Sequence, residues 1–282
     1  MRKARVLWGA ALIVLTLLTA ACEPQRPAYA LTSAGRIISF DAAKPTKIKS
    51  EVSVRGLDSD ESLVQLDYRP AADAFYCITS KARLCRVEPK TGAVTLVGNT
   101  TFSSETLVNP VIDFNPVADR LRVIASAQNL RVNPNDGQQA GTDTDAFYDG
   151  DDVNDDRTPQ FAAIAYDRNQ SGAAATTLFG LDVATQSLVR VGSRNGAPDS
   201  PNTGRLFTIA ALPVAFTANA GFDIEPEGDV AYAALAASGT GAVLYRIGLT
   251  SGSADRVDAI GKGDRTIISL AVGPEEPVSV GQ

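Results

Sequence analysis

Carboxylates crowd one short segment of this 282-residue chain. Between Asp143 and Asp156, a span of 14 residues holds seven Asp and one Asn, with Gly150 in its middle. So many like charges repel one another at neutral pH unless solvent, a basic partner or a cation neutralises them. Calcium takes roughly six to eight oxygen ligands and suits Asp, Asn and backbone carbonyls in a glycine-containing loop. The segment is therefore a candidate site for a calcium ion.

The first-choice ligands within this segment are Asp149, Asp151, Asp152 and Asn154. Their spacing is not that of an EF-hand, which needs D-x-[DN]-x-[DN]-G followed by a Glu at the twelfth position. The alternative is a solvated acidic loop whose Asp side chains form Asx turns. The sequence leaves both interpretations open, and calcium is the only cofactor to which it points.

The chain contains no histidine. This excludes Ser-His-Asp and Cys-His hydrolases, His-ligated zinc sites and c-type haem ligation. The G-x-S-x-G, Walker A and Rossmann patterns are also missing from the sequence. An enzyme of this composition would have to use carboxylates, Lys, Tyr or a hard metal. We therefore assign no catalytic residue and expect a binding protein more than an enzyme.

The N-terminus has the features of an export signal, and we assign residues 1–21 as a signal peptide. Three basic residues precede an apolar run, Val6–Ala21, of 16 residues. That run is shorter than the roughly 20 residues that span a bilayer. It ends in Leu-Thr-Ala-Ala-Cys, which resembles a bacterial lipoprotein box with Cys22 as the lipidated residue. The alternative is ordinary cleavage after Ala30. Glu23 favours the outer membrane if the cell has two membranes.

Removing the signal leaves 23 basic against 32 acidic residues, a net charge of −9. Such an acidic body repels nucleic-acid phosphates, so we expect no nucleic acid among its partners. The partners that fit are the membrane, through the N-terminal lipid, and an envelope protein or glycan. Residues 22–28 are then a lipid-attached tether, 29–274 one domain and 275–282 a C-terminal tail.

Two cysteines remain after the lipidated one, and an exported protein can oxidise them. Cys77 and Cys85 lie in two alternating runs that flank a short polar turn at 80–82. If that turn forms a hairpin, the two residues face each other across an antiparallel ladder, close enough for a disulfide. We predict a structural disulfide, because the C-x-x-C spacing of a redox pair is missing.

A repeated sequence pattern indicates the fold that positions the candidate residues. A pattern of apolar, any, apolar, then polar or small residue recurs five times along the chain. A period of about 45–50 residues with strand-like alternation predicts a β-propeller with one blade per repeat. Helical periodicity is nearly missing, so the fold class is all-β. The five copies are 38–41, 85–88, 130–133, 179–182 and 245–248.

A second repeat, D-x-x-P-x-x-D, starts at Asp67, Asp113 and Asp223. Each copy lies between two apolar runs, which predicts a hairpin. We expect its acids to cap turn amides, with a ligand role as the less favoured alternative.

The two ends of the domain look like parts of one blade. Residues 29–57 offer three strands with no inner strand before them, and Ile267–Val272 is a strand without a blade of its own. Pairing them closes the ring and leaves no exposed edge. The prediction is about five four-stranded blades. Six blades remain an alternative, because the last interval between repeats is unusually long.

Several segments resemble bacterial domain-of-unknown-function family 4394. The resemblance covers nearly the whole mature chain and implies an exported, propeller-like protein, without bringing an activity. The residues that carry it are 111–123, 128–133, 148–166, 176–182 and 220–224.

Two functions fit these observations. The first is a lipid-anchored, non-catalytic propeller that binds an envelope protein or glycan or serves as a scaffold. The second is a calcium-dependent hydrolase of the lactonase type, which holds one metal near the axis with Glu, Asn and Asp and needs no His. The second requires acids from at least three blades to converge on the central channel.

Overall fold

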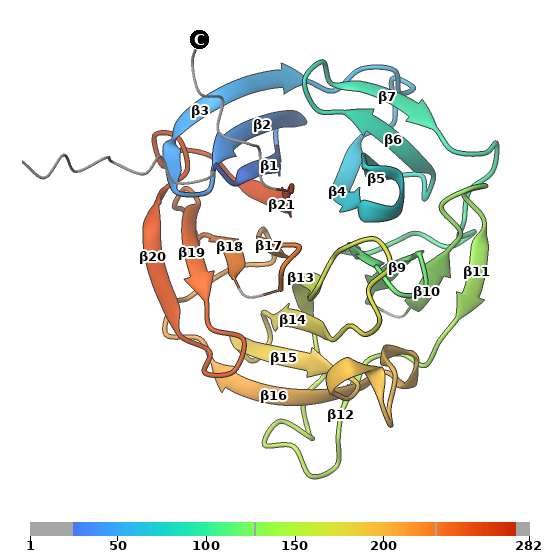
Figure 1. Cartoon of the computed structure of the whole chain (residues 1–282), viewed down its shortest axis with the longest axis vertical. Helices are drawn as coiled ribbons and strands as arrows, with labels where there is room; N and C mark the ends of the chain where they lie inside the picture. Colours follow the sequence, from blue (N-terminus) through green and yellow to red (C-terminus); the bar gives the residue numbers. More distant parts are fainter. Residues whose placement is uncertain (1–24, 127, 229, 275–282) are drawn as a thin grey trace, which may run out of the picture.

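Five twisted sheets surround a common axis, and the chain passes from one to the next around the ring (Figure 1). The computed structural model describes residues 25–126, 128–228 and 230–274. The signal peptide, Cys22 and the tail at 275–282 lie outside these residues. The all-β propeller of five blades is confirmed, and the interval that left room for a sixth contains none.

The blades are numbered from the one that holds the N-terminal strands, and the strands of each are given from the axis outward. Blade 1 contains β21 (Ile267–Val272), β1 (Pro27–Thr32), β2 (Arg36–Asp41) and β3 (Lys44–Ser53). Blade 2 contains β4 (Leu63–Arg69), β5 (Ala74–Thr79), β6 (Leu84–Glu88) and β7 (Ala93–Leu96). Blade 3 contains β8 (Val111–Asn115), β9 (Arg120–Ala125), β10 (Gln128–Val132) and β11 (Gln139–Thr142).

Blade 4 contains β13 (Phe161–Tyr166), β14 (Leu178–Asp182), β15 (Ser187–Val191) and β16 (Arg205–Ala211), with β12 (Phe147–Tyr148) added parallel to the outer strand. Blade 5 contains β17 (Gly221–Ile224), β18 (Ala231–Leu235), β19 (Val243–Ile247) and β20 (Ala254–Ala259). Three single-turn 3-10 helices complete the described elements: η1 (Pro70–Ala72), η2 (Arg194–Gly196) and η3 (Pro201–Thr203). No helix of the described residues is long and apolar enough to cross a membrane.

The ring closes as the sequence predicts. Strand β21 supplies the inner strand of blade 1 and pairs antiparallel with β1, with Tyr29 opposite Ala271. The domain starts slightly earlier than Tyr29, because β1 begins at Pro27 and the side chain of Arg26 is buried against Glu225 at 3.4 Å. Residues 26–28, which we assigned to the tether, therefore pack on the domain.

One copy of the short repeat lies on a different strand from the others. In blades 1, 2, 3 and 5 the repeat falls on the third strand from the axis, but 179–182 forms β14, the second strand of blade 4. The third strand there is β15, and a loop containing η2 and η3 delays the outer strand to Arg205. This offset, and not a hidden blade, accounts for the long interval.

Apolar side chains fill the five interfaces between neighbouring blades. Each interface has its own buried cluster, such as the one where Tyr76 of blade 2 meets Phe114 of blade 3, with ring centroids 5.3 Å apart. Aromatic side chains therefore take part in the packing between blades. The predicted hairpin also forms, with Cys77 opposite Cys85 in β5 and β6, a Cα–Cα distance of 5.1 Å and a disulfide between them.

Candidate functional site

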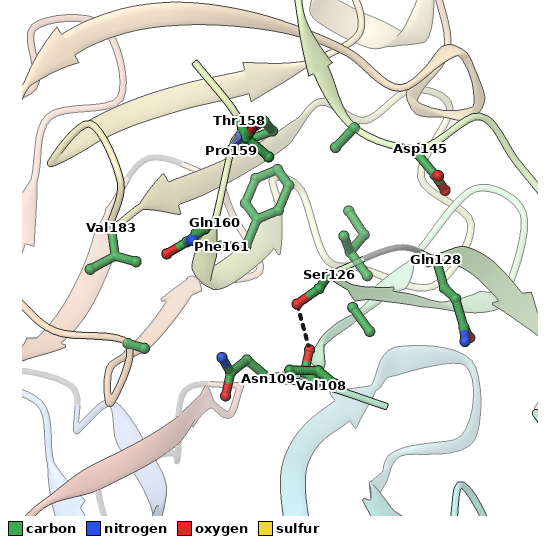
Figure 2. Close-up of a pocket in the computed structure, with 14 residues that line it drawn as sticks. Val108, Asn109, Ser126, Gln128, Asp145, Thr158, Pro159, Gln160, Phe161 and Val183 are labelled. Carbon is green, nitrogen blue, oxygen red and sulfur yellow. Dashed lines mark hydrogen bonds between the residues drawn. The ribbon is translucent and has the colours of Figure 1, made fainter. Parts of the chain in front are cut away.

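A hollow lies between blades 3 and 4, where the inner strands begin (Figure 2). Its volume is about 320 Å³, enough for a sugar unit or a short peptide segment. A second hollow of about 280 Å³ surrounds the mouth of the central channel. The two share Asn109, Phe161 and Ala218, so they form one continuous depression.

The ring of Phe161, the first residue of β13, lies near the centre of the lining side chains (Figure 2). A glycine makes room for this ring: a Cβ at Gly180 would lie 2.5 Å from its Cε1 atom. The ring is 8% exposed, so it gives the pocket a mostly buried apolar wall. Val108, at the opposite side, is 52% exposed and adds a second apolar surface.

Polar side chains with spare hydrogen-bonding capacity surround this apolar centre. Asn109, Asp145, Thr158 and Gln160 are exposed lining residues, and their side chains form no hydrogen bond or ion pair with any described residue. Together they offer two amides, one hydroxyl and one carboxylate. None of the described lining residues is Lys or Arg. The pocket therefore suits an uncharged or cationic polar ligand and disfavours a phosphorylated one.

A buried arginine holds the walls of the pocket in place. Arg122 of β9 is 3% exposed and pairs with Asp143 at 3.1 Å. It also donates to Tyr166 Oη of β13 at 2.8 Å and to Asn202 Oδ1 at 2.6 Å. Asn129, fully buried, donates to the carbonyl oxygen of Thr144 at 2.9 Å. The segment that carries Asp145 is thus joined to both blades.

The acidic segment runs along the outer edge of blade 4, where its side chains bind the protein itself. Asp149 pairs with Arg205, and this contact holds the pKa of the Asp149 carboxyl below its usual range. Asp152 accepts from the amide and the hydroxyl of Thr208, the latter at 2.7 Å, and Asn154 donates to the same hydroxyl at 2.9 Å. These contacts fasten the segment to strand β16.

The same segment contains two of the expected Asx turns. Asp149 Oδ1 accepts from the amide of Asp151 at 3.2 Å, and Asp152 Oδ1 accepts from the amide of Asn154 at 2.9 Å. Asp151 itself is exposed. A calcium ion held by Asp149, Asp151, Asp152 and Asn154 stays a prediction.

Three acids from three different blades meet on the propeller axis instead. Asp67 of β4, Asp113 of β8 and Asp223 of β17 each offer a carboxylate oxygen, and these atoms lie within 4.8 Å of one another. All three residues are at most 2% exposed. We call this group the axial triad. Within the described residues, no other set of three or more acidic or Cys side chains converges in this way.

The axial triad satisfies the backbone amides that the inner strands turn toward the axis. Asp67 accepts from Tyr68 of its own blade at 2.7 Å and from Phe114 of blade 3 at 2.8 Å. Asp113 accepts from Tyr166 of blade 4 at 2.9 Å. The acids therefore link neighbouring blades. We expected them to cap turn amides, which is wrong: the amides belong to strands, because the side chains point to the axis.

Asp223 completes the set, with the amides of Ile224 at 2.7 Å and of Val272, in β21, at 2.5 Å. Together the three carboxyls thus accept a hydrogen bond from one backbone amide of each of the five blades. Blades 4 and 1 have Ala165 and Ala271 at the equivalent strand positions, so they contribute no acid of their own.

Burial and mutual repulsion make these acids hard to ionise. Desolvation raises the pKa of Asp67 to about 7, against the lowering effect of its two amide donors. Desolvation, and then the charges of the other two acids, raise the pKa of Asp113 well above its usual range. The same burial, followed by the charge of Asp67, raises the pKa of Asp223. A proton or a cation must therefore accompany the axial triad.

The profile of a family described as "Domain of unknown function (DUF4394)" matches residues 36–271. The chain belongs to the DUF4394 family. The match to DUF4394 runs from β2 to β21 and so includes strands of all five blades, the pocket and the axial triad. No curated protein matches the chain in sequence.

Similar folds occur among solved structures. One is a structural-genomics protein of unknown function from Bacteroides thetaiotaomicron VPI-5482, with 14% identity and a TM-score of 0.50 over 75% of this chain and 54% of that one. The chain thus spans about half the length of that protein. TolB from Acinetobacter baumannii has 12% identity and a TM-score of 0.44, over 89% and 67% of the two chains. At these identities the likeness concerns the fold alone.

Sequence reasoning missed the lining of the pocket and the convergence of the axial triad. Asn109, Thr158 and Gln160 come from loops and carry no motif that could single them out. The triad did leave a signal, because all three acids are the first Asp of the D-x-x-P-x-x-D repeat. The last Asp of the repeat serves differently: Asp73 accepts from Tyr68 Oη at 2.6 Å, and Asp119 pairs with Arg69.

Proposed function

We propose that this DUF4394 protein is a non-catalytic binding module of the cell envelope, anchored by a lipid on Cys22. Its ligand is a neutral, polyhydroxylated molecule of the glycan class, bound in the pocket between blades 3 and 4. The observation that carries this proposal is the set of uncommitted amide, hydroxyl and carboxylate groups around the Phe161 ring. Such groups recognise the hydroxyls of a sugar through hydrogen bonds, while Phe161 and Val108 supply the apolar wall of the pocket.

The carboxylate content of the pocket favours binding over hydrolysis. A glycoside hydrolase needs two carboxyl groups on either side of the bond that it cleaves. Asp145 is the only carboxylate among the described lining residues. Acid–base catalysis by a pair is therefore not supported at this site.

The axial triad meets one requirement of the alternative, a lactonase-type hydrolase, since it brings acids from three blades together. A hydrolase also needs a path for its substrate. The channel above the triad holds a cavity of only about 10 Å³, roughly the space of one water molecule. The triad oxygens also accept backbone amides, which supports a structural role and makes the non-catalytic function the better-supported one.

The position of the first strand supports the lipid anchor at Cys22 over signal cleavage after Ala30. Such cleavage would remove Pro27–Ala30, which is most of β1. That strand pairs with both β2 and β21, so its loss would leave the inner strand of blade 1 without its neighbour.

Binding of envelope glycans to the purified mature protein tests the ligand class, by glycan array followed by calorimetry. We expect Asn109→Ala and Gln160→Ala each to weaken binding at least tenfold, because each removes hydrogen bonds to the ligand. Gln139→Ala, on the exposed outer strand β11, is the matched control and should leave binding unchanged. Turnover of lactones, or glycan binding that both pocket variants retain, would overturn the proposal.

Labelling of cells with radioactive palmitate tests the anchor. The label should appear in the wild-type protein and disappear in Cys22→Ser. Incorporation that survives this substitution would refute the anchor without touching the ligand proposal.

A further inference from the structure

We infer that the axial triad of Asp67, Asp113 and Asp223 binds a calcium ion on the propeller axis. This site is separate from the acidic segment on the outer edge of blade 4 and from the pocket. It would fasten three of the five blades to one another at the centre of the ring.

The first argument comes from an oxygen that the hydrogen-bond network does not use. Asp67 and Asp223 each accept backbone amides on both carboxylate oxygens, so the five axial amides require a carboxylate at those two positions. Asp113 accepts one amide, on Oδ1. Its Oδ2 accepts no hydrogen bond from any described residue. An Asn would serve the amide equally well, so the charge at Asp113 needs another explanation.

The second argument is an unpartnered polar side chain next to the triad. Asn169 is 2% exposed, and its Oδ1 has no hydrogen-bond partner among the residues that the structure describes. Its Nδ2 donates to the carbonyl oxygen of Tyr68 at 3.5 Å. The amide of Tyr68 points to the axis, where it meets Asp67, and in a β-strand the carbonyl of the same residue points to the same side.

The loop that carries Asn169 crosses the axis below the triad. It connects β13 with β14 of blade 4, yet Asn169 reaches Tyr68 of blade 2, and Gln170 donates to the carbonyl oxygen of Pro226 in blade 5 at 2.7 Å. The unpartnered amide oxygen therefore belongs to a side chain held against Tyr68, the residue after Asp67, and is the fourth oxygen that we infer for the site. Such an oxygen is costly to bury unless something binds it.

The spacing of the oxygens is compatible with calcium, which takes roughly six to eight oxygen ligands in flexible geometry. Ligand atoms on opposite sides of a calcium ion are separated by up to about 4.6–5.2 Å. The triad oxygens lie within 4.8 Å of one another. The small cavity directly above, lined by Gln65 and Ser269 among others, has room for one water ligand.

The negative charge of the axial triad also favours a bound cation. No basic side chain of the described residues pairs with the three acids: Arg69 pairs with Asp119, and Arg122 pairs with Asp143. Three buried carboxyls without a cationic partner must either take up protons or bind a cation. A divalent ion neutralises most of the charge while leaving the amide hydrogen bonds in place.

Metal analysis of the purified mature protein after gel filtration tests the inference, together with terbium luminescence. The mature chain has no Trp, so terbium on the axis would be sensitised by tyrosines such as Tyr166, which is fully buried near the triad. We expect one retained calcium per chain, competition between terbium and calcium, and a higher melting temperature with calcium than with EDTA.

The variants separate the axial site from the acidic segment. Asp113→Asn, which keeps an acceptor for Tyr166, should lower calcium affinity about 100-fold, and Asn169→Ala about tenfold. The double variant Asp151→Ala with Asn154→Ala should leave calcium affinity unchanged. The exposed control Asp255→Asn should leave it unchanged as well. If Asp113→Asn fails to fold, Asn169→Ala decides the question.

Two results would overturn the inference. One is a wild-type protein that retains no calcium and melts identically in calcium and EDTA, in which case protons neutralise the triad. The other is calcium binding that Asp113→Asn and Asn169→Ala leave unchanged.

Discussion

Replacing Asp113 with Asn should remove part of the pH dependence of stability in metal-free protein. The unfolded pKa of an Asp lies near 3.8, and burial raises that of Asp67 to about 7 in the fold. The folded state then binds more protons than the unfolded state between these values. The stabilisation is complete below the unfolded pKa and is lost as pH rises through the folded pKa.

The magnitude follows from the shift. For Asp67, three pKa units at about 1.4 kcal/mol each give a loss of roughly 4 kcal/mol of unfolding free energy between pH 4 and pH 8. Burial also raises the pKa of Asp113. Asp113 therefore adds up to about 1.4 kcal/mol per pH unit to this loss of unfolding free energy, over the pH range in which it is protonated in the folded state and ionised in the unfolded state. Asn resembles the protonated acid and keeps the bond to Tyr166, so it removes this slope.

Urea unfolding in EDTA at pH 5, 6, 7 and 8 measures the effect. We expect the slope of unfolding free energy against pH to be less negative in Asp113→Asn by up to about 1.4 kcal/mol per unit, and the variant to exceed the wild type in stability at pH 7. Surface acids with lowered pKa, such as Glu51 beside Arg265, act in the opposite direction, but they cancel in the difference. Asp255→Asn is the control. Parallel curves for wild type and Asp113→Asn would refute the reasoning, because they would mean that Asp113 is ionised in the fold.

Three further changes should lower stability for reasons visible in the structure. Replacing Cys77 and Cys85 together with Ser removes a short closed loop and should cost about 2–3 kcal/mol of unfolding free energy in guanidinium, an effect that a reductant on the wild type should reproduce. Arg122→Met removes one of the two arginines that pair with the buried Asp143, the other being Arg131, and leaves Asn202 Oδ1 without its donor, so it should cost about 2–3 kcal/mol in the same assay; a loss under 1 kcal/mol would contradict the proposed network. Gly204→Ala adds a methyl against the carbonyl oxygen of Asp145 at a φ of +70°, so calorimetry should show a lower melting temperature and weaker glycan binding.

The fold was predictable because a propeller repeats itself. Blades 2, 3 and 5 each carry the third-strand pattern, and each also has the Asp-x-x-Pro turn. Two independent sequence patterns therefore mark the same three blades. Blade 4 lacks that Asp and has Ala165 in its place, so the short pattern alone was matched to β14, one strand too early. Strand-like alternation does not reveal where in a sheet a strand lies.

The candidate sites were harder to predict, because they depend on which side chains the ring brings together. The acidic segment stood out by composition, yet much of its charge is taken up by contacts with Arg205 and Thr208. The axial triad comprises single acids in three separate blades, and no spacing within one blade reveals their convergence. A five-bladed ring with Asp at equivalent inner positions does imply it, once those positions are known to face the axis.

The closure of the ring has a consequence for how the protein is made. Blade 1 cannot complete its sheet until β21, which follows the strands of the other four blades in the chain, reaches β1. Contacts so distant in sequence form slowly. Until then β1 has an unpaired edge that another chain could occupy. Folding of this chain therefore calls for protection of the waiting strand, and its exposure would favour strand exchange between neighbouring molecules.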